Sequence, residues 1–253
     1  MNLYEGIFER QSIRHYRMEA LDTKIINNIL NYASHLENLS DGVRTGFRVL
    51  TWQNVKKHLM GTLHIKAPYY LVLFSDVVEE SMLNAGYLLG QIDLYMVSRG
   101  LGTCFFNGAR LLCDGENGLV PIMAIGFGRP ERQYYRSSKR TKRLPLSEIC
   151  TIKEEVSEEE RCIVEAARLA PSSMNNQPWR FVLYNGRIHL FCKKNRLPVP
   201  GIQRLHFLDT GIALAYLAVG AEEFWFNPEL IKVENISEKQ FKRNEYVITM
   251  RWK

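Results

Sequence analysis

The apolar positions of this 253-residue chain follow helical and strand-like patterns in turn. Residues Asp22–Ala33 and Ser157–Ala167 carry apolar side chains at helical spacing behind a polar first residue, which predicts two amphipathic helices. Two longer apolar stretches, each containing Leu-x-x-Gly at Leu83–Gly86 and Leu208–Gly211, predict buried helices. Strands are predicted at Phe47–Leu50, Val120–Phe127, Phe181–Tyr184 and Tyr246–Trp252.

These elements occur twice in the same order, which predicts a fold made of two similar halves. In each half an amphipathic helix, a polar crossing, a strand, a long apolar helix and an apolar strand follow one another. Matching elements lie about 125 to 134 residues apart, so the repeat is a whole α+β unit. We expect an α+β sandwich, with a mixed or antiparallel central sheet flanked by helices, whose halves are residues 1–150 and the shorter 151–253.

The polar crossing of the second half has an unusual composition. Residues 170–181 read Ala-Pro-Ser-Ser-Met-Asn-Asn-Gln-Pro-Trp-Arg-Phe and join the end of a helix to a strand. Pro171 ends the helix because its ring clashes with the preceding turn. Neutral hydrogen-bond donors and acceptors then follow at Ser172, Ser173, Asn175 and Gln177. Such a set suits a planar heterocycle with alternating carbonyl and N–H groups along one edge, as in a flavin.

This segment resembles the signature of the nitroreductase family of FMN-dependent oxidoreductases. Three further segments are similar to that family's motifs: the opening Arg-x-Ser-x-Arg and aromatic residue, the exit from the central helix, and a stretch near the end of many members. They lie at Ile7–Tyr16, Arg99–Gly108 and Arg143–Ile149. In most of the family the helix-end motif follows the opening motif closely, whereas here it lies in the second half. That order resembles a branch in which one chain contains two halves that mimic the usual dimer, and it implies a nitroreductase-like α-β-α sandwich.

The resemblance implies an FMN site and assigns its phosphate side to the opening motif, Arg10-Gln11-Ser12 and Arg14. Arg10, Ser12 and Arg14 alternate, so in an extended segment their side chains point the same way. Arg10 and Ser12 are expected to hold phosphate and ribityl oxygens, and Arg14 to reach the pyrimidine end of the ring. A fixed cation there favours the reduced, anionic ring.

The flavin ring is expected to meet the remaining motifs. By the resemblance, the ring edges lie along Pro171, Ser172, Ser173 and Asn175, and backbone amides near flavin N5 come from Phe106, Asn107 and Gly108. Arg143 is expected to make a second phosphate contact. Gln177 is expected to set the loop's shape, and Trp179 to belong to the core. No catalytic acid, nucleophile or metal ligand is predicted, because hydride transfer to a flavin needs position and electrostatics rather than a protein base.

Each flavin motif is present once, which has consequences for stoichiometry. In ordinary dimers of the resembling family, the opening motif of one subunit and the helix-end motif of the other meet at one flavin. This chain keeps one copy of each, so we expect one intact FMN site across an internal pseudo-twofold and the loss of the other. Because the internal pairing removes the usual reason to dimerise, we favour a monomer, and a homodimer stays open.

The predicted activity is the reduction of a nitroaromatic, quinone or similar conjugated small-molecule acceptor by NADH or NADPH, in ping-pong exchange at bound FMN. One alternative is a flavin-binding storage or sensor protein without turnover. Another is a specialised reductase of the same family, such as a dehalogenase or an enoate-type reductase, because acceptor specificity resides in variable pocket loops.

Charge and cysteine content add two expectations. The formal net charge is +6, and residues 131–143 alone carry six basic side chains against one acidic side chain. This run is either a solvated loop or a segment that closes over a phosphate of FMN or NAD(P)H, and nucleic-acid binding is a weaker alternative. The five cysteines form no CxxC pair, which indicates reduced thiols in the cytoplasm. The chain shows no signal segment, and its longest apolar run is too short for a membrane span.

Overall fold

The computed structural model describes residues 1–56, 59–60, 65–106, 110–111, 115, 117–132, 142–195, 201–234, 236 and 243–252. The earlier elements are α1 (Leu3–Glu9), α2 (Thr23–Ser34), β1 (Thr45–Thr51), α3 (Trp52–Val55), β2 (Leu59–Met60), β3 (Tyr69–Ser75), α4 (Ser81–Ser98), β4 (Gly102–Phe105), β5 (Arg110–Leu111) and β6 (Val120–Gly128). The later elements are α5 (Leu146–Ile149), β7 (Cys150–Ile152), α6 (Glu158–Arg168), the 3₁₀ turn η2 (Ser173–Asn175), β8 (Trp179–Tyr184), β9 (Arg187–Lys193), α7 (Ile202–Glu223), β10 (Glu229–Ile231) and β11 (Asn244–Arg251).

The described strands form two main sheets with the same internal order. The first sheet runs β1-β3-β6-β4, and the second runs β10-β11-β9-β8-β7. Read from its other edge, the second sheet contains the order β8-β9-β11-β10, which matches β1-β3-β6-β4 of the first sheet strand for strand. The first sheet is antiparallel throughout, and the second gains β7 beside β8 in parallel. The predicted α+β fold with two pseudo-symmetric halves is therefore confirmed, but each half has its own sheet instead of sharing a central one.

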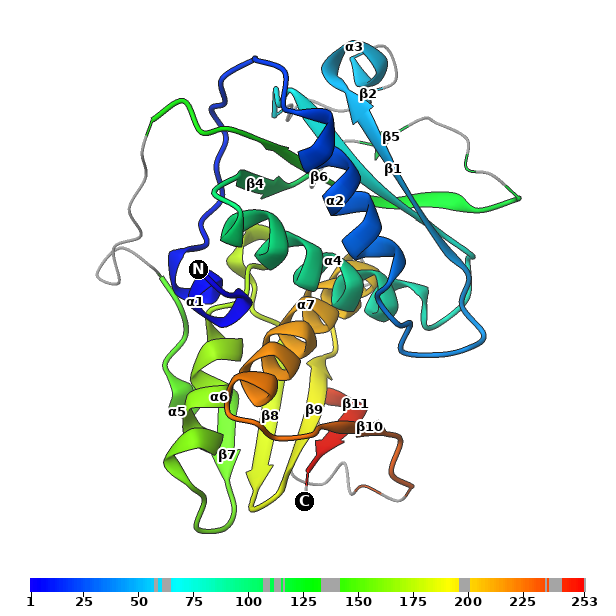
Figure 1. Ribbon diagram of the computed structural model, residues 1–253. Coiled ribbons are helices and arrows are strands. Elements are labelled where there is room, and N and C mark those ends of the chain that lie inside the picture. The colour runs from blue at the N-terminus through cyan, green and yellow to red at the C-terminus, as the bar shows by residue number, and fades with distance from the viewer. Residues whose placement is uncertain are drawn as a thin grey trace.

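The two long helices α4 and α7 pack against each other between these sheets (Figure 1). Their closest approach is at the two Leu-x-x-Gly segments noted in the sequence. A Cβ atom at Gly86 would overlap the carbonyl oxygen of Leu208, and one at Gly211 would overlap that of Leu83. Each hypothetical Cβ would also lie 3.0 Å from the other glycine's Cα atom. This reciprocal pattern is what a twofold axis between the helices produces.

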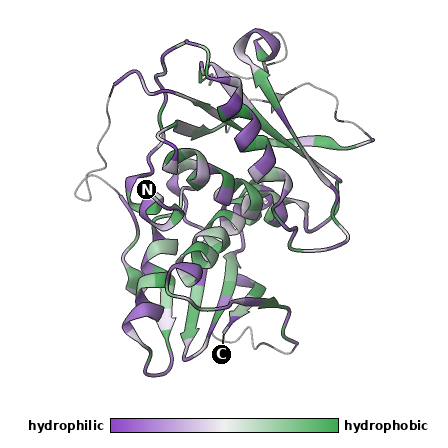
Figure 2. Ribbon diagram, viewed as in Figure 1, coloured by the Kyte–Doolittle hydropathy of each residue, from purple (hydrophilic) through white to green (hydrophobic). Residues whose placement is uncertain are grey.

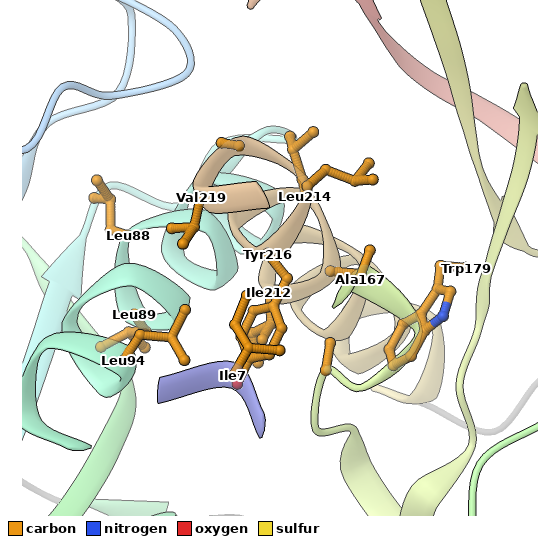
Figure 3. Close-up of a cluster of buried hydrophobic side chains, with 14 of the residues drawn as sticks. Ile7, Leu88, Leu89, Leu94, Ala167, Trp179, Ile212, Leu214, Tyr216 and Val219 are labelled. Carbon is orange, nitrogen blue, oxygen red and sulfur yellow. The ribbon is translucent and has the colours of Figure 1, made fainter. Parts of the chain in front are cut away.

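The core is continuous across the helix crossing. Both α4 and α7 are apolar on nearly all sides because protein surrounds them. Figure 3 shows Ile7 of α1 beside Ile212 and Tyr216 of α7, with Leu88 and Leu89 of α4 nearby. Figure 2 shows hydrophobic residues along the central helices and the strands β8 and β9, and more hydrophilic ones along α2. Trp179, predicted to belong to the core, is fully buried.

Local signals in the sequence set the starts of the two amphipathic helices. Asp22 caps α2 by accepting from the backbone N–H of Lys24. Ser157 and Glu160 form a capping box at α6, in which each side chain accepts from the other's backbone N–H, at 3.2 and 2.9 Å. Both helices begin where the polar first residues predicted.

The boundary between the halves stays a prediction. The expected division after residue 150 falls inside β7, whose residues Cys150–Ile152 pair with Phe181–Leu183 of β8. We propose that the first half ends just before β7.

The described cysteines Cys104, Cys150, Cys162 and Cys192 are free thiols. None of the described helices has the length and apolar character that crossing a membrane requires.

The helix crossing predicts a strong and position-specific effect of adding one methyl group. Gly86→Ala should lower the free energy of unfolding by about 3 kcal/mol or more, because the new Cβ meets backbone atoms that cannot rotate away. Gly220→Ala in α7 is the matched control, since its Cβ would come no closer than 3.4 Å to Ile163. It should be neutral or stabilising by up to about 1 kcal/mol. Urea denaturation measures both, and equal effects at the two sites would contradict the described crossing.

Candidate functional site

A cavity opens between the segment that follows α1 and the loop that follows α6. It contains about 510 Å³ of empty space, part of it open to solvent, which suits a small-molecule site. Its first wall is lined by Arg10, Ser12, Arg14, Cys104, Phe105 and Met123. Its second wall is lined by Pro171, Ser172, Ser173, Met174, Leu208, Asp209 and Ile212. The opening motif and the polar crossing, which are far apart in the sequence, therefore meet at one cavity.

The opening motif reaches the cavity because it runs as an extended arm along β4. Ser12 pairs with Thr103 in a parallel bridge, and the N–H of Ile13 donates to the carbonyl of Thr103 at 2.8 Å. Tyr16 anchors the arm through its hydroxyl, which donates to the carbonyl of Ile13 at 2.6 Å and lies 3.0 Å from that of Gly126. An extended arm places alternate residues on one side, so Arg10, Ser12 and Arg14 all line the cavity, as predicted.

Arg10 is held in a buried ion pair that the sequence did not indicate. Its Nε donates to Asp93 Oδ2 of α4 at 2.8 Å, with the two side chains 3% and 0% exposed. Its Nη1 donates to Ser12 Oγ at 3.4 Å, and its guanidinium lies 5.6 Å from the centre of the Phe105 ring. Nη2 has no hydrogen-bond partner among the described residues. The phosphate contact predicted for Arg10 stays a prediction, with Nη2 as the donor left for it.

Arg14 is the more available of the two arginines. It is exposed, lines the cavity, and makes no hydrogen bond or ion pair with the residues that the structure describes. Its guanidinium is therefore free to bind an anionic group of a ligand. Beside it, burial raises the pKa of the Cys104 thiol, so this side chain is a neutral thiol on the cavity wall.

The polar crossing forms a tight loop with strained backbone. Met174, Asn175 and Gln177 all have positive φ, at 50°, 58° and 47°, a conformation that is costly for residues other than glycine. Hydrogen bonds hold the loop in place. The N–H of Gln177 donates to Ser172 Oγ at 3.0 Å, and Gln177 Oε1 accepts from the N–H of Leu144 at 2.8 Å. Gln177 therefore sets the loop's shape, as predicted.

Asp209 of α7 holds the cavity side of this loop. Its carboxylate accepts from the N–H of Ser173, at 3.0 Å to each oxygen, and from Ser173 Oγ at 3.2 Å. The side chain is almost completely buried. Burial raises the pKa of Asp209 to about 7, against the opposing effect of the Ser173 hydrogen bonds. A carboxyl group on this wall can thus gain or lose a proton near neutral pH.

Several predicted site residues lie away from the cavity lining. Asn175 and Arg143 bond to each other, with Arg143 Nη1 donating to Asn175 Oδ1 at 2.9 Å. Phe106 packs edge-on against Tyr70 on the far side of the first sheet, and Gln11 is not part of the lining. The flavin contacts predicted for these four residues stay predictions. Asn107, Gly108 and most of the basic run 131–143 lie outside the described residues.

Two functional candidates not predicted from the sequence are the buried carboxylates Asp93 and Asp209, although the sequence holds a signal for both. Asp93 and Asp209 are single acidic residues within the most apolar stretches of the chain. Carboxylates are almost never fully buried without a partner, so each could have been used to predict a specific donor nearby. The periodicity alone could not show that the donors would be Arg10 and Ser173.

Within the part of the chain that the structure describes, no group of three acidic, cysteine or histidine side chains could hold a metal ion.

The ion pair between Arg10 and Asp93 predicts an asymmetric response to mutation. Asp93→Ala should lower the free energy of unfolding by about 3–5 kcal/mol, because it leaves a buried guanidinium without a counter-charge. The double variant Arg10→Met/Asp93→Leu replaces both charges by apolar groups and should recover most of that loss. Thermal denaturation of the three proteins checks this. A double variant no more stable than Asp93→Ala would rule out the pair as described.

The buried Asp209 predicts stability that falls as the pH rises. Between about pH 4 and pH 7 the folded chain holds a proton that the unfolded chain has released. Relative to Asp209→Asn, the free energy of unfolding should therefore fall by up to ~1.4 kcal/mol per pH unit in that window. Urea denaturation of both proteins across the window measures this. A stability difference that does not change with pH would show that the carboxyl does not titrate there.

Comparisons with known proteins agree with the fold. The model of a family described as "Putative TM nitroreductase" matches residues 2–221. The crystal structure of a Thermotoga maritima protein, described as a "putative nitroreductase", aligns with this chain at a TM-score of 0.66 and 20% sequence identity. The alignment covers 100% of this chain and 94% of the Thermotoga maritima chain.

Two shorter structures match just over half of the chain. An FMN-dependent nitroreductase from Clostridium difficile covers 57% of this chain with 96% of its own, at a TM-score of 0.45 and 19% identity. A nitroreductase family protein from Streptococcus pneumoniae covers 58% with 98% of its own, at 0.45 and 18% identity. No curated protein matches this chain. Because the family model spans most of the sequence, the chain belongs to this nitroreductase family.

Proposed function

We propose that this protein is an FMN-dependent oxidoreductase that uses NADH or NADPH to reduce nitroaromatic, quinone or similar conjugated acceptors by ping-pong exchange. The observation that carries the proposal is the meeting of the arginine-bearing arm and the Ser172–Ser173 corner at one cavity. The family membership supports the class of reaction. FMN, when bound, supplies hydride transfer, and the chain supplies position and electrostatics.

The residues of the cavity fit the chemistry of FMN. An anionic phosphate needs a cationic donor, which Arg10 offers through Nη2, an atom with no hydrogen-bond partner among the described residues. The exposed guanidinium of Arg14 offers positive charge to the ring. The apolar body of the ring needs an apolar lining, which Phe105, Leu208 and Ile212 offer. The polar ring edge needs neutral donors and acceptors, which the loop serines offer.

The chain's own residues do three things in this proposal. Arg14 holds positive charge beside the cavity, which stabilises the negative charge that a flavin gains on reduction. The buried pair of Arg10 and Asp93 fixes the arm, so the arm's remaining donors are already in position before a ligand binds. Leu208 and Ile212 keep water from part of the cavity and strengthen these electrostatic effects.

One FMN per chain is the proposed stoichiometry. The pseudo-symmetric counterpart of Asp209 is Asn84 of α4, which accepts from the N–H of Leu39 at 2.8 Å and donates to Asn38 Oδ1 at 2.9 Å. The counterpart loop therefore keeps its anchor but lacks the Pro-Ser-Ser signature, and no second arm motif occurs in the sequence. Since both halves are already paired, we also propose a monomer, located in the cytoplasm where thiols stay reduced.

The visible spectrum of the purified protein tests the cofactor directly. We expect flavin absorbance that scales with protein at about one FMN per chain and bleaches when NADH or NADPH is added. Reoxidation by a quinone or a nitroaromatic compound should then restore the colour. Bound flavin that no nicotinamide donor bleaches would support a storage or sensor protein instead, and two FMN per chain would contradict the single site.

The proposed contact of Arg14 with the flavin is tested by a pair of arginine variants in the same arm. Arg14→Ala should weaken FMN binding at least tenfold, because a charged hydrogen bond contributes about 1.5–3 kcal/mol. Arg17→Ala is the matched control, since Arg17 is also exposed but does not line the cavity. Fluorescence titration of apoprotein with FMN gives both dissociation constants. Equal weakening in the two variants would indicate a diffuse effect of charge and not a contact at Arg14.

A further inference from the structure

Asp209 is placed to affect a ligand as well as the loop. It belongs to the cavity lining, and its carboxylate is held against the N–H and Oγ of Ser173. The opposite wall carries the cations Arg10 and Arg14. A ligand in this cavity therefore lies between two guanidinium groups and one buried carboxyl group.

Anchoring the loop does not by itself require a carboxylate. In the other half, the amide of Asn84 does the equivalent work by accepting from the N–H of Leu39 at 2.8 Å. That side chain is also fully buried, on the helix that pairs with α7. The second half thus carries an ionisable group, which lines the cavity, at a position where the first half carries a neutral one. The difference points to a role for the proton or the charge.

The surroundings of Asp209 leave its charge weakly compensated. Ser173 of η2 is the donor at its oxygens, while Cys192 of β9 and His206 of its own helix are nearby ionisable groups. His206 is occupied elsewhere, because its Nδ1 bonds to the carbonyl of Lys193 at 3.2 Å. From α4, Asp93 is paired with Arg10. Burial raises the pKa of Asp209, and the hydrogen bonds from the Ser173 N–H and Oγ lower it. A further negative charge in the cavity would raise this pKa and so favour the protonated carboxyl group.

We propose that Asp209 takes up a proton when the flavin in this cavity is reduced, so that two-electron reduction is coupled to protonation of this carboxyl group. The inference rests on the proposed function. Oxidised FMN gains two electrons and one proton to become the anionic reduced flavin, and the carboxylate of Asp209 gains a second proton from water. The electrons come from NADH or NADPH in turnover, or from dithionite in the test. Asp209 is a positioning residue for the loop, and its proton uptake removes one negative charge from the cavity wall as the flavin gains one.

The coupling makes a measurable difference to the reduction potential. For a two-electron couple, a tenfold change in the equilibrium constant shifts the reduction potential by about 30 mV. One pH unit is a tenfold change in proton concentration, so one additional proton taken up per two electrons makes the potential fall more steeply, by up to about 30 mV per pH unit. The effect is confined to the pH range in which the oxidised protein holds Asp209 ionised and the reduced protein holds it protonated. Above about pH 7 the oxidised protein meets the first condition.

Spectroelectrochemical titration of the FMN-bound protein between about pH 7 and pH 8.5 tests the proposal. We expect the wild-type potential to fall more steeply than that of Asp209→Asn, whose amide keeps an acceptor for Ser173. The control is His206→Gln, which removes a buried titratable group one turn away on α7 that does not line the cavity. It should keep the wild-type slope.

Infrared difference spectroscopy of the wild-type protein gives a second readout that needs no variant. The spectrum of the oxidised protein is subtracted from that of the protein reduced by dithionite. Reduction should produce a protonated-carboxyl C=O band and remove carboxylate intensity. Equal slopes in wild type and Asp209→Asn, or no such band, overturn the inference while leaving the FMN site standing. Loss of the extra slope in His206→Gln overturns it as well. A chain that binds no flavin overturns the proposed function itself.

Discussion

The backbones of α4 and α7 approach closely at Gly86 and Gly211, and this contact positions both halves of the molecule. Without side chains at these positions the two helix backbones touch, and each glycine lies against the carbonyl group of the other helix's leucine. This contact sets one sheet on each side of the helix pair (Figure 1). It also brings an arm from the first half and a loop from the second to the same place.

Two buried carboxylates connect the central helices to the segments that line the cavity. Asp93 of α4 holds Arg10 of the arm, and Asp209 of α7 holds Ser173 of the loop. Each half therefore ties its own polar segment to its own central helix, and the helix crossing then places the two segments opposite each other. Burying these charges is costly unless each finds its partner, so the helices and the segments favour a single mutual arrangement.

The pseudo-symmetry covers the main elements of the scaffold, with β7 as an addition to the second sheet, but it does not extend to the motifs at the site. Strand order, helix crossing and loop anchor all recur, down to Asn84 at the place of Asp209. The arm motif and the Pro-Ser-Ser signature each occur once. Leu208 and Ile212 belong to the core as well as to the cavity lining, whereas the polar motif residues Arg14, Ser172 and Ser173 are not part of the core. This division favours one cofactor in a chain that contains two copies of the scaffold.

The element types, the repeat and the two segments that meet at the cavity could be predicted from the order of the amino acids alone. Helix caps at Asp22 and Ser157, the paired Leu-x-x-Gly segments and the alternation of Arg10, Ser12 and Arg14 are local properties, set by residues close to each other in the chain. Three features became visible only in the folded chain: the two separate sheets, the ion pair between Arg10 and Asp93, and the bond of Asn175 to Arg143. Those features depend on which distant groups meet when a charge or an amide leaves water, and neither periodicity nor spacing carries that information.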